Sequence, residues 1–202
     1  MSPSETSLES LLQNARSYAG IGARNTPPLV LPLMEQLGEA LGHYPLTLRS
    51  GGSPGADSAF ERGCDRAGGA KEIFLPWKGF NGNPSPLFSP PREAEAVAAL
   101  LHPNWRACSP GARKLHARNC QQVYGRGIDA PADFVLFWAP ECSGVIEGGT
   151  ATAVRLAREM NIPTFNLWDD PTRLRWQAFV DGEREKRLTL WETLLGSLYK
   201  KR

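Results

Sequence analysis

The stretch Ser17-Tyr-Ala-Gly-Ile-Gly22 is a short apolar run that ends in a glycine. Such a run, closed by a residue that permits a tight turn, predicts a strand buried on both faces. Thr26 is then expected to cap a helix that has Pro27 as its first residue and apolar side chains at helical spacing as far as Leu41. A buried strand, a glycine turn and an amphipathic helix form the repeating unit of an α/β sheet.

The same alternation continues along the chain. It predicts four more strands, over residues 46–50, 72–76, 132–138 and 163–168, and further helices over residues 6–15, 56–67, 92–101, 109–124 and 150–160. Five strands that alternate with helices predict a parallel sheet with helices on both faces and right-handed crossovers. The fold class is therefore α/β, and we expect residues 1–202 to form a single domain with its core over about residues 17–168.

The last part of the chain is expected to be helical. Residues 171–202 predict a C-terminal helical extension whose apolar side chains pack against the body, namely Trp176, Phe179, Leu190, Trp191, Leu194 and Leu198. Because symmetric dimers are the commonest oligomers, we expect a homodimer, with this helix as one plausible contact.

Composition excludes several classes of protein. The chain has 202 residues, of which 41% are hydrophobic and 22% charged, close to the average of globular domains. No apolar run of membrane-spanning length is present, and the polar N-terminus does not resemble a secretory signal, so we expect a cytoplasmic protein with no membrane partner. Four scattered cysteines without a C-x-x-C pair indicate reduced thiols rather than disulfides or zinc ligands, and no metal or cofactor is expected.

Positive charge is concentrated in the middle of the chain. The net charge is only +2, but residues 76–127 hold seven basic and two acidic side chains. This segment is a candidate positive pole for an anionic ligand, or else a solvated basic face. Within it, residues 77–91 are rich in Pro, Gly, Asn and Ser, which favours either a lid over a ligand or a surface loop.

Three glycine turns follow predicted strands, at residues 20–24, 51–57 and 148–152. In a parallel sheet the carboxyl ends of the strands lie at one edge, where ligands bind. Each turn leads into a helix, whose first amide groups are unpaired and can bind phosphate. The stretch from Gly148 to Thr152 is the best phosphate candidate, whereas Asp57 either accepts from ribose hydroxyls or caps its helix.

A second candidate lies late in the helix at 109–124. Arg118 could pair with a phosphate or form a structural salt bridge, and His116 either packs or faces a ligand. Neither a phosphate loop of the G-x-x-x-x-G-K-[ST] type nor a complete G-x-G-x-x-G fingerprint is present, which argues against a standard nucleoside triphosphatase or dehydrogenase.

These motifs resemble a known group. The stretches 18–24, 49–57 and 147–150 are similar to successive signatures of the SLOG superfamily, which joins DNA-processing protein A with the LONELY GUY-type phosphoribohydrolases. The first two are closer to DNA-processing protein A, whereas Leu115-His-Ala-Arg-Asn119 is similar to the helix that supplies the catalytic arginine of the phosphoribohydrolases. The order and spacing of the motifs most resemble an uncharacterised, often phage-encoded branch.

The resemblance implies a Rossmann-like fold and a nucleotide-derived ligand. The glutamate pair of the phosphoribohydrolases is replaced here by Val154 and Arg155, so Asp57, Glu61 or Glu147 would have to supply the missing carboxylate. The implied catalytic set is Arg118, Asp57 and Glu147. The implied ligand-binding residues are Gly22, Arg24, Gly51, Gly52, Ser53, Gly55, Asn119, Gly148, Gly149, Thr150 and Thr152.

Three functions follow from these expectations. The first is binding of a nucleotide, with hydrolysis of the N-glycosidic bond of a nucleoside monophosphate. The second is a single-stranded DNA-binding module related to DNA-processing protein A, in which Trp77, Phe80 and Trp105 could stack on bases. The third is a protein without catalysis, either a nucleotide sensor or an interaction protein with a vestigial pocket, and the missing glutamate pair supports the vestigial pocket.

Overall fold

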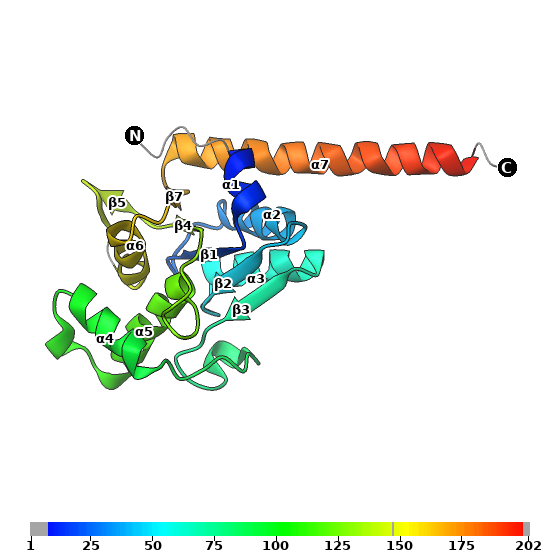
Figure 1. Cartoon of the computed structure of the whole chain (residues 1–202). Coiled ribbons are helices and arrows are strands. Elements are labelled where there is room, and N and C mark those ends of the chain that lie inside the picture. The colour runs from blue at the N-terminus through cyan, green and yellow to red at the C-terminus, as the bar shows by residue number, and fades with distance from the viewer. Residues whose placement is uncertain (1–7, 147, 200–202) are drawn as a thin grey trace.

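The computed structural model, which describes residues 8–146 and 148–199, contains a five-stranded parallel sheet. Its strands lie in the order β3 (Ala70–Ile73), β2 (Thr47–Ser50), β1 (Ser17–Gly22), β4 (Phe134–Trp138) and β7 (Thr164–Asn166) (Figure 1). Every neighbouring pair is parallel. The chain has the predicted α/β, Rossmann-like architecture. Strand β1, which is the apolar run from Ser17 to Gly22, lies at the centre of the sheet.

Helices cover both faces of the sheet. The helices are α1 (Leu8–Asn14), α2 (Leu31–Gly42), α3 (Ala56–Ala67), α4 (Arg92–Leu101), α5 (Pro110–Tyr124), α6 (Thr150–Glu159) and α7 (Asp170–Tyr199), with short 3-10 turns η1 (Phe80–Gly82) and η2 (Trp105–Ala107). An antiparallel hairpin, β5 (Glu141–Cys142) and β6 (Val145–Ile146), precedes α6.

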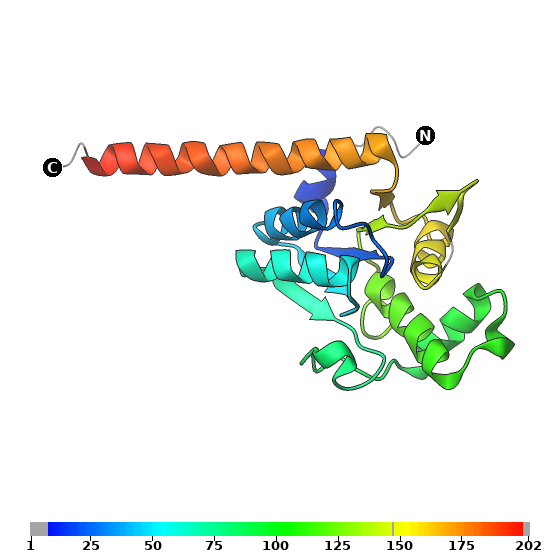
Figure 2. The ribbon, with the colours of Figure 1, turned by 180° about the vertical axis from the view of Figure 1, so that it is seen from behind.

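Alternation along the strands explains the two layers. Tyr18 and Phe134 point into one apolar cluster with α1, α2, α3 and α7, whereas Ala19 and Val135 point into the other with α4, α5 and α6. Successive side chains of a strand face opposite sides of a sheet, so strands that are apolar at every position can bury both faces. Figure 2 shows the molecule from behind.

Two helices begin where their capping residues predict. Helix α3 starts after Gly55, at a φ of 87°, and ends at Gly68, which has a left-handed φ of 66°. Helix α5 starts with Pro110 after Ser109, whose hydroxyl accepts a hydrogen bond from the backbone N–H of Ala112 at 3.2 Å. Glycine suits the left-handed position, and serine pairs one of the free amides at a helix start.

The predicted start of α2 is wrong by four residues. The hydroxyl of Thr26 donates to the carbonyl of Ala23 at 2.6 Å and does not cap the helix, which begins at Leu31. The third strand is also shifted, because β3 ends at Ile73, and Leu75 pairs instead with Phe88 in an isolated bridge.

Helix α7 is a single helix of 30 residues that packs on the body over its first half. Trp176 is fully buried and Phe179 lies 6.1 Å from the ring of Tyr44, but Leu190 and Trp191 are 60% and 64% exposed. The prediction that these last two pack on the body is therefore wrong. The side chains of Leu194 and Leu198 lie outside the part of the chain that is described.

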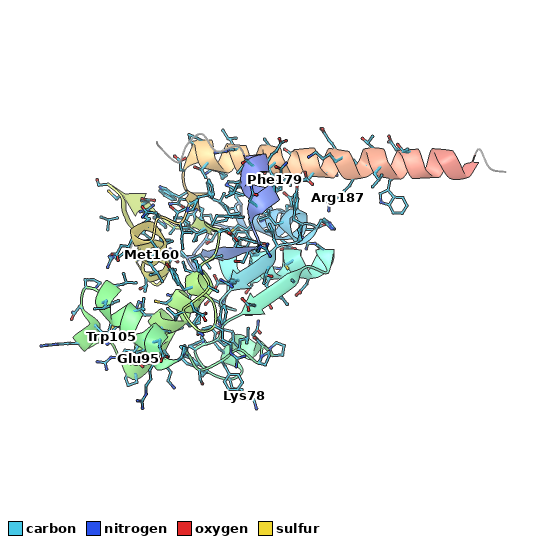
Figure 3. The ribbon with its side chains drawn as sticks, viewed as in Figure 1. Lys78, Glu95, Trp105, Met160, Phe179 and Arg187 are labelled. Atoms are coloured by element: carbon cyan, nitrogen blue, oxygen red, sulfur yellow. The ribbon has the colours of Figure 1, made fainter. Side chains whose placement is uncertain are left out.

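Leu190 and Trp191 are exposed because of the path of α7. Arg187 lies 3.9 Å from Glu39 of α2, and the helix continues straight beyond it (Figures 1 and 3).

None of the described helices combines the length and hydropathy needed to cross a membrane. The four cysteines are free thiols.

Candidate functional site

A cavity of about 1180 Å³ opens at the carboxyl ends of β1 and β4. The chain leaves β1 toward β2 on one side, and β4 joins on the other, so this is the point where the strand order reverses. Ligands of open α/β sheets bind at such a point. Ten of the residues predicted as site residues line the cavity: Gly22, Arg24, Ser53, Asp57, Arg118, Asn119, Gly148, Gly149, Thr150 and Thr152.

The floor of the cavity contains a buried ion pair. Nη1 of Arg118 on α5 lies 3.3 Å from Oδ2 of Asp57 at the start of α3, and the two side chains are 5% and 3% exposed. Nη2 of Arg118 donates to the Ser53 hydroxyl at 3.0 Å. The sequence left a phosphate ligand and a structural salt bridge open for Arg118, and in this structure its guanidinium forms the salt bridge.

Asp57 joins three segments. Its carboxylate accepts a hydrogen bond from the backbone N–H of Ser53 at 3.3 Å, and the backbone of Gly22 also donates to it. Burial is the larger effect on the pKa of Asp57 and raises it, while Arg118 opposes the rise. Burial likewise lowers the pKa of Arg118 against the attraction of Asp57. Each charge therefore depends on the other for its stability inside the protein.

Glycine is required beside this pair. A Cβ atom at Gly51 would lie 1.7 Å from Nη1 of Arg118, so only glycine leaves room for the guanidinium. Gly52, at a φ of 63°, lies against Leu75, and Gly55 lies against the carbonyl of Arg24. These three glycines are not among the described residues that line the cavity. They shape its wall and do not face its interior.

The opposite wall is the start of helix α6. Gly148, at a φ of 81°, and Gly149 are exposed, and the N-cap residue Gly149 has no side chain that could occupy the first amide groups. Nδ2 of Asn119 donates to the carbonyl of Gly149 at 2.6 Å, which ties this turn to α5. The positive end of the helix dipole favours an anion here. Glu147, predicted as catalytic, lies outside the described residues.

Basic side chains add to the positive charge at the cavity. Arg24 is exposed on the cavity, and its charge adds to the effect of burial in lowering the pKa of Arg118. Among the described residues, the carboxylates on the cavity are Asp57 and Glu141, and both are engaged. Glu141 accepts from Arg158 at 2.8 Å and from Asn166 at 2.9 Å. The cavity therefore favours an anionic ligand.

The predicted lid lies elsewhere. Residues 77–91 contribute none of the described residues that line the cavity. Phe80 is buried with its ring 5.9 Å from the guanidinium carbon of Arg118, and Nδ2 of Asn81 donates to the carbonyl of Gly52 at 3.1 Å. The loop therefore packs against the ion pair, with Phe80 buried beside Arg118.

No protein-family model and no curated protein sequence matches this chain. Among solved structures it is similar to DNA processing protein A from Helicobacter pylori, with a TM-score of 0.54 and 15% identity over 87% of this chain and 83% of that one. The two proteins share a fold. The structure of DNA processing protein A was described for its mode of binding single-stranded DNA.

Two cavity residues with aromatic rings, Trp168 and His102, were not predicted as site residues from the sequence. Trp168 follows β7, is 47% exposed on the cavity, and meets Trp138 edge-on with ring centroids 5.5 Å apart. Its place at the end of the last predicted strand was the available signal. His102, at the end of α4, also lines the cavity and lies 4.4 Å from the ring of His116. Burial, together with the charges of His102 and Arg118, lowers the pKa of His116.

Proposed function

We propose that this chain binds single-stranded DNA through the cavity at the carboxyl edge of the sheet. Phosphate groups would lie at the start of α6 and beside Arg24, and a base would stack on Trp168. One observation carries the proposal: a single cavity combines the amino end of a helix without a side-chain cap, an exposed guanidinium and an exposed indole ring.

Each part has a physical role. Single-stranded nucleic acid is bound by positive grooves that follow the backbone and by aromatic rings on which bases stack, each worth about 1–3 kcal/mol. The volume of about 1180 Å³ exceeds that of most small-molecule pockets, which run from about 300 to 1,000 Å³. The shared fold with DNA processing protein A, which binds single-stranded DNA, adds support.

The test is fluorescence anisotropy of a labelled single-stranded oligonucleotide at several salt concentrations. We expect log affinity to fall with log salt by about 0.7 for each phosphate that is neutralised. Arg24→Ala should reduce this slope by about 0.7, and Trp168→Ala should weaken binding about tenfold or more at every salt concentration.

The controls lie on α7, away from the cavity. Arg184 and Trp191 are an exposed arginine and an exposed tryptophan there, so Arg184→Ala and Trp191→Ala should bind DNA as the wild type does. No binding, a flat salt response, or equal losses in the cavity and control variants would exclude the proposal.

A second candidate is binding of a free nucleoside monophosphate, favoured by the start of α6, which faces the cavity. Cleavage of its glycosidic bond needs a carboxylate at the sugar, but the described carboxylates of the cavity are engaged in other contacts. We therefore propose binding without cleavage. Displacement of DNA by nucleoside monophosphates tests the binding, and chromatographic detection of released base would restore the hydrolase hypothesis.

The other sequence-based expectations also stay proposals. We propose a single domain over residues 1–202, a cytoplasmic location, membership of the phage-associated branch, and a homodimer. Leu188 and Leu190 are 55% and 60% exposed on α7 and supply an apolar contact for the dimer. Light scattering on wild type and Leu190→Glu tests the dimer, which the variant should dissociate.

A further inference from the structure

A cluster of metal-ligating side chains lies at the rim of the cavity. It consists of His102 at the end of α4, Cys108 just after η2, and His116 on α5. One ligand atom from each residue lies within 4.8 Å of the other two, and all three residues are half-buried. The chain has three histidines, and two of them meet at this cluster.

The distances suit a tetrahedral metal ion. Sγ of Cys108 lies 3.6 Å from Nδ1 and 3.8 Å from Nε2 of His102. Bonds of about 2.3 Å to sulfur and about 2.0 Å to nitrogen, at a tetrahedral angle, separate those two ligand atoms by about 3.5 Å. Sγ of Cys108 and Nδ1 of His102 are therefore already near the spacing of bound ligands, and a metal ion at Nδ1 would replace the hydrogen bond that this atom accepts from the backbone N–H of Asn104 at 3.2 Å. One ring nitrogen of His116 lies within 4.8 Å of the ligand atoms of the other two residues.

A neighbouring hydroxyl orients the second imidazole. Oγ1 of Thr152 lies 2.8 Å from Nδ1 of His116, which leaves Nε2 of that ring for a metal. Metal-bound histidines usually have their other ring nitrogen hydrogen-bonded in this way. The ring of Trp105 meets both histidine rings edge-on, with centroids 6.2 and 6.4 Å away, and gives the cluster an apolar side.

We propose that His102, Cys108 and His116 bind a transition-metal ion, with a fourth position open to the cavity. Both histidines line the cavity, so a water molecule or an anionic oxygen of a ligand can reach that position. One thiolate and two imidazoles select zinc or a similar ion over magnesium or calcium. Three protein ligands with one open position are typical of zinc ions that bind or activate a ligand. The sequence analysis expected no metal and assigned Cys108 no such role.

The first test measures metal binding by the protein alone, without DNA, so its result is independent of the proposed function. Protein stripped with a chelator is titrated with Zn²⁺ and, in parallel, with Co²⁺. We expect one equivalent of either ion, and a thiolate-to-cobalt charge-transfer band together with the intense visible bands of four-coordinate Co²⁺.

Variants assign the ligands. Cys108→Ser should abolish the charge-transfer band. Both Cys108→Ser and His102→Gln should weaken Zn²⁺ binding by at least about tenfold. Thr152→Val should have a similar effect, because it removes the hydrogen bond to Nδ1 of His116. The matched controls are Cys142→Ser, an exposed thiol on the same cavity, and His43→Gln, an exposed histidine before β2. Both controls should bind as the wild type does.

A measurement on the wild type guards against variants that do not fold. Zn²⁺ should slow alkylation of Cys108, followed by peptide mass spectrometry, and leave the rate at Cys142 unchanged. The proposal is overturned if the folded wild type binds no zinc at micromolar concentrations. It is equally overturned if Cys108→Ser keeps the cobalt–thiolate band, or if zinc protects Cys142 and not Cys108.

Discussion

The buried pair of Arg118 and Asp57 gives the sharpest prediction about stability. Its atoms lie 3.3 Å apart, and neither side chain is more than 5% exposed. Removing one partner of such a pair leaves a charge buried without compensation and costs about 3–5 kcal/mol. We expect Arg118→Met and Asp57→Asn each to lower the free energy of unfolding by about that amount. In the double variant no charge is left unpaired, so the total cost should fall short of the sum by at least about 2 kcal/mol.

Urea unfolding followed by circular dichroism measures all four proteins of this cycle. The slopes of the unfolding free energy against urea must agree between variants for the comparison to hold. The control is the exposed pair of Arg62 and Glu35, whose side chains are 53% and 24% exposed and 2.7 Å apart. Such a pair contributes less than about 1 kcal/mol, so Arg62→Met should change little.

The reasoning is refuted by either of two outcomes. The first is a cost below about 1 kcal/mol for Arg118→Met, the range of an exposed pair. The second is additivity of the two substitutions within about 0.5 kcal/mol, which is the behaviour of independent sites. Both outcomes would mean that the guanidinium is solvated and free to bind a ligand. DNA affinity of Arg118→Met, measured under folding conditions, separates this role from that of Arg24.

Three further predictions concern glycine, thiols and pH. Gly51→Ala should lower the free energy of unfolding in urea by about 3 kcal/mol, because the added Cβ would displace the guanidinium of Arg118 from Asp57. A Cβ at Gly149 would have its nearest neighbour 3.8 Å away, so Gly149→Ala should change that free energy by less than about 0.5 kcal/mol. At pH 8 an alkylating reagent should label exposed Cys142 and spare Cys64, because burial raises the pKa of Cys64 to about 11; equal labelling in a mass-spectrometric time course would contradict this. Hydrogen bonds from two arginines of α3 lower the pKa of Glu35, so its stabilising effect is present at neutral pH and is lost as the pH falls below about 4. The stability difference between wild type and Glu35→Gln should therefore vanish in acid, and a difference that persists would count against the ion pair.

The fold could be predicted because its signals are local. Gly55 and Gly68 mark the bounds of α3, and Ser109 with Pro110 marks the start of α5, through turn and capping chemistry that needs no distant partner. The start of α2 failed because the Thr26 hydroxyl has a nearer acceptor in the carbonyl of Ala23. Boundaries set by competition between hydrogen-bond partners cannot be decided from residue types alone.

The site was predictable only in part. The convergence of the glycine turns at one cavity follows from parallel strands, whose carboxyl ends share an edge. Whether Arg118 forms a salt bridge or faces a ligand depends on Asp57, which is 61 positions away in the sequence, and on the space left by Gly51. The cluster of His102, Cys108 and His116 comes from three different elements and matches no short spacing motif, so only the packing of α4 against α5 reveals it.

The projecting end of α7 has a consequence for handling the protein. Thirty residues at about 1.5 Å each give a rod of about 45 Å, and its outer part lies beyond the other elements in both views (Figures 1 and 2). Such a rod increases hydrodynamic drag, so the particle should elute from a sizing column earlier than a sphere of its mass. None of the described residues that line the cavity lies on α7, so attachment of the protein to a sensor surface through this outer part leaves the cavity residues unmodified.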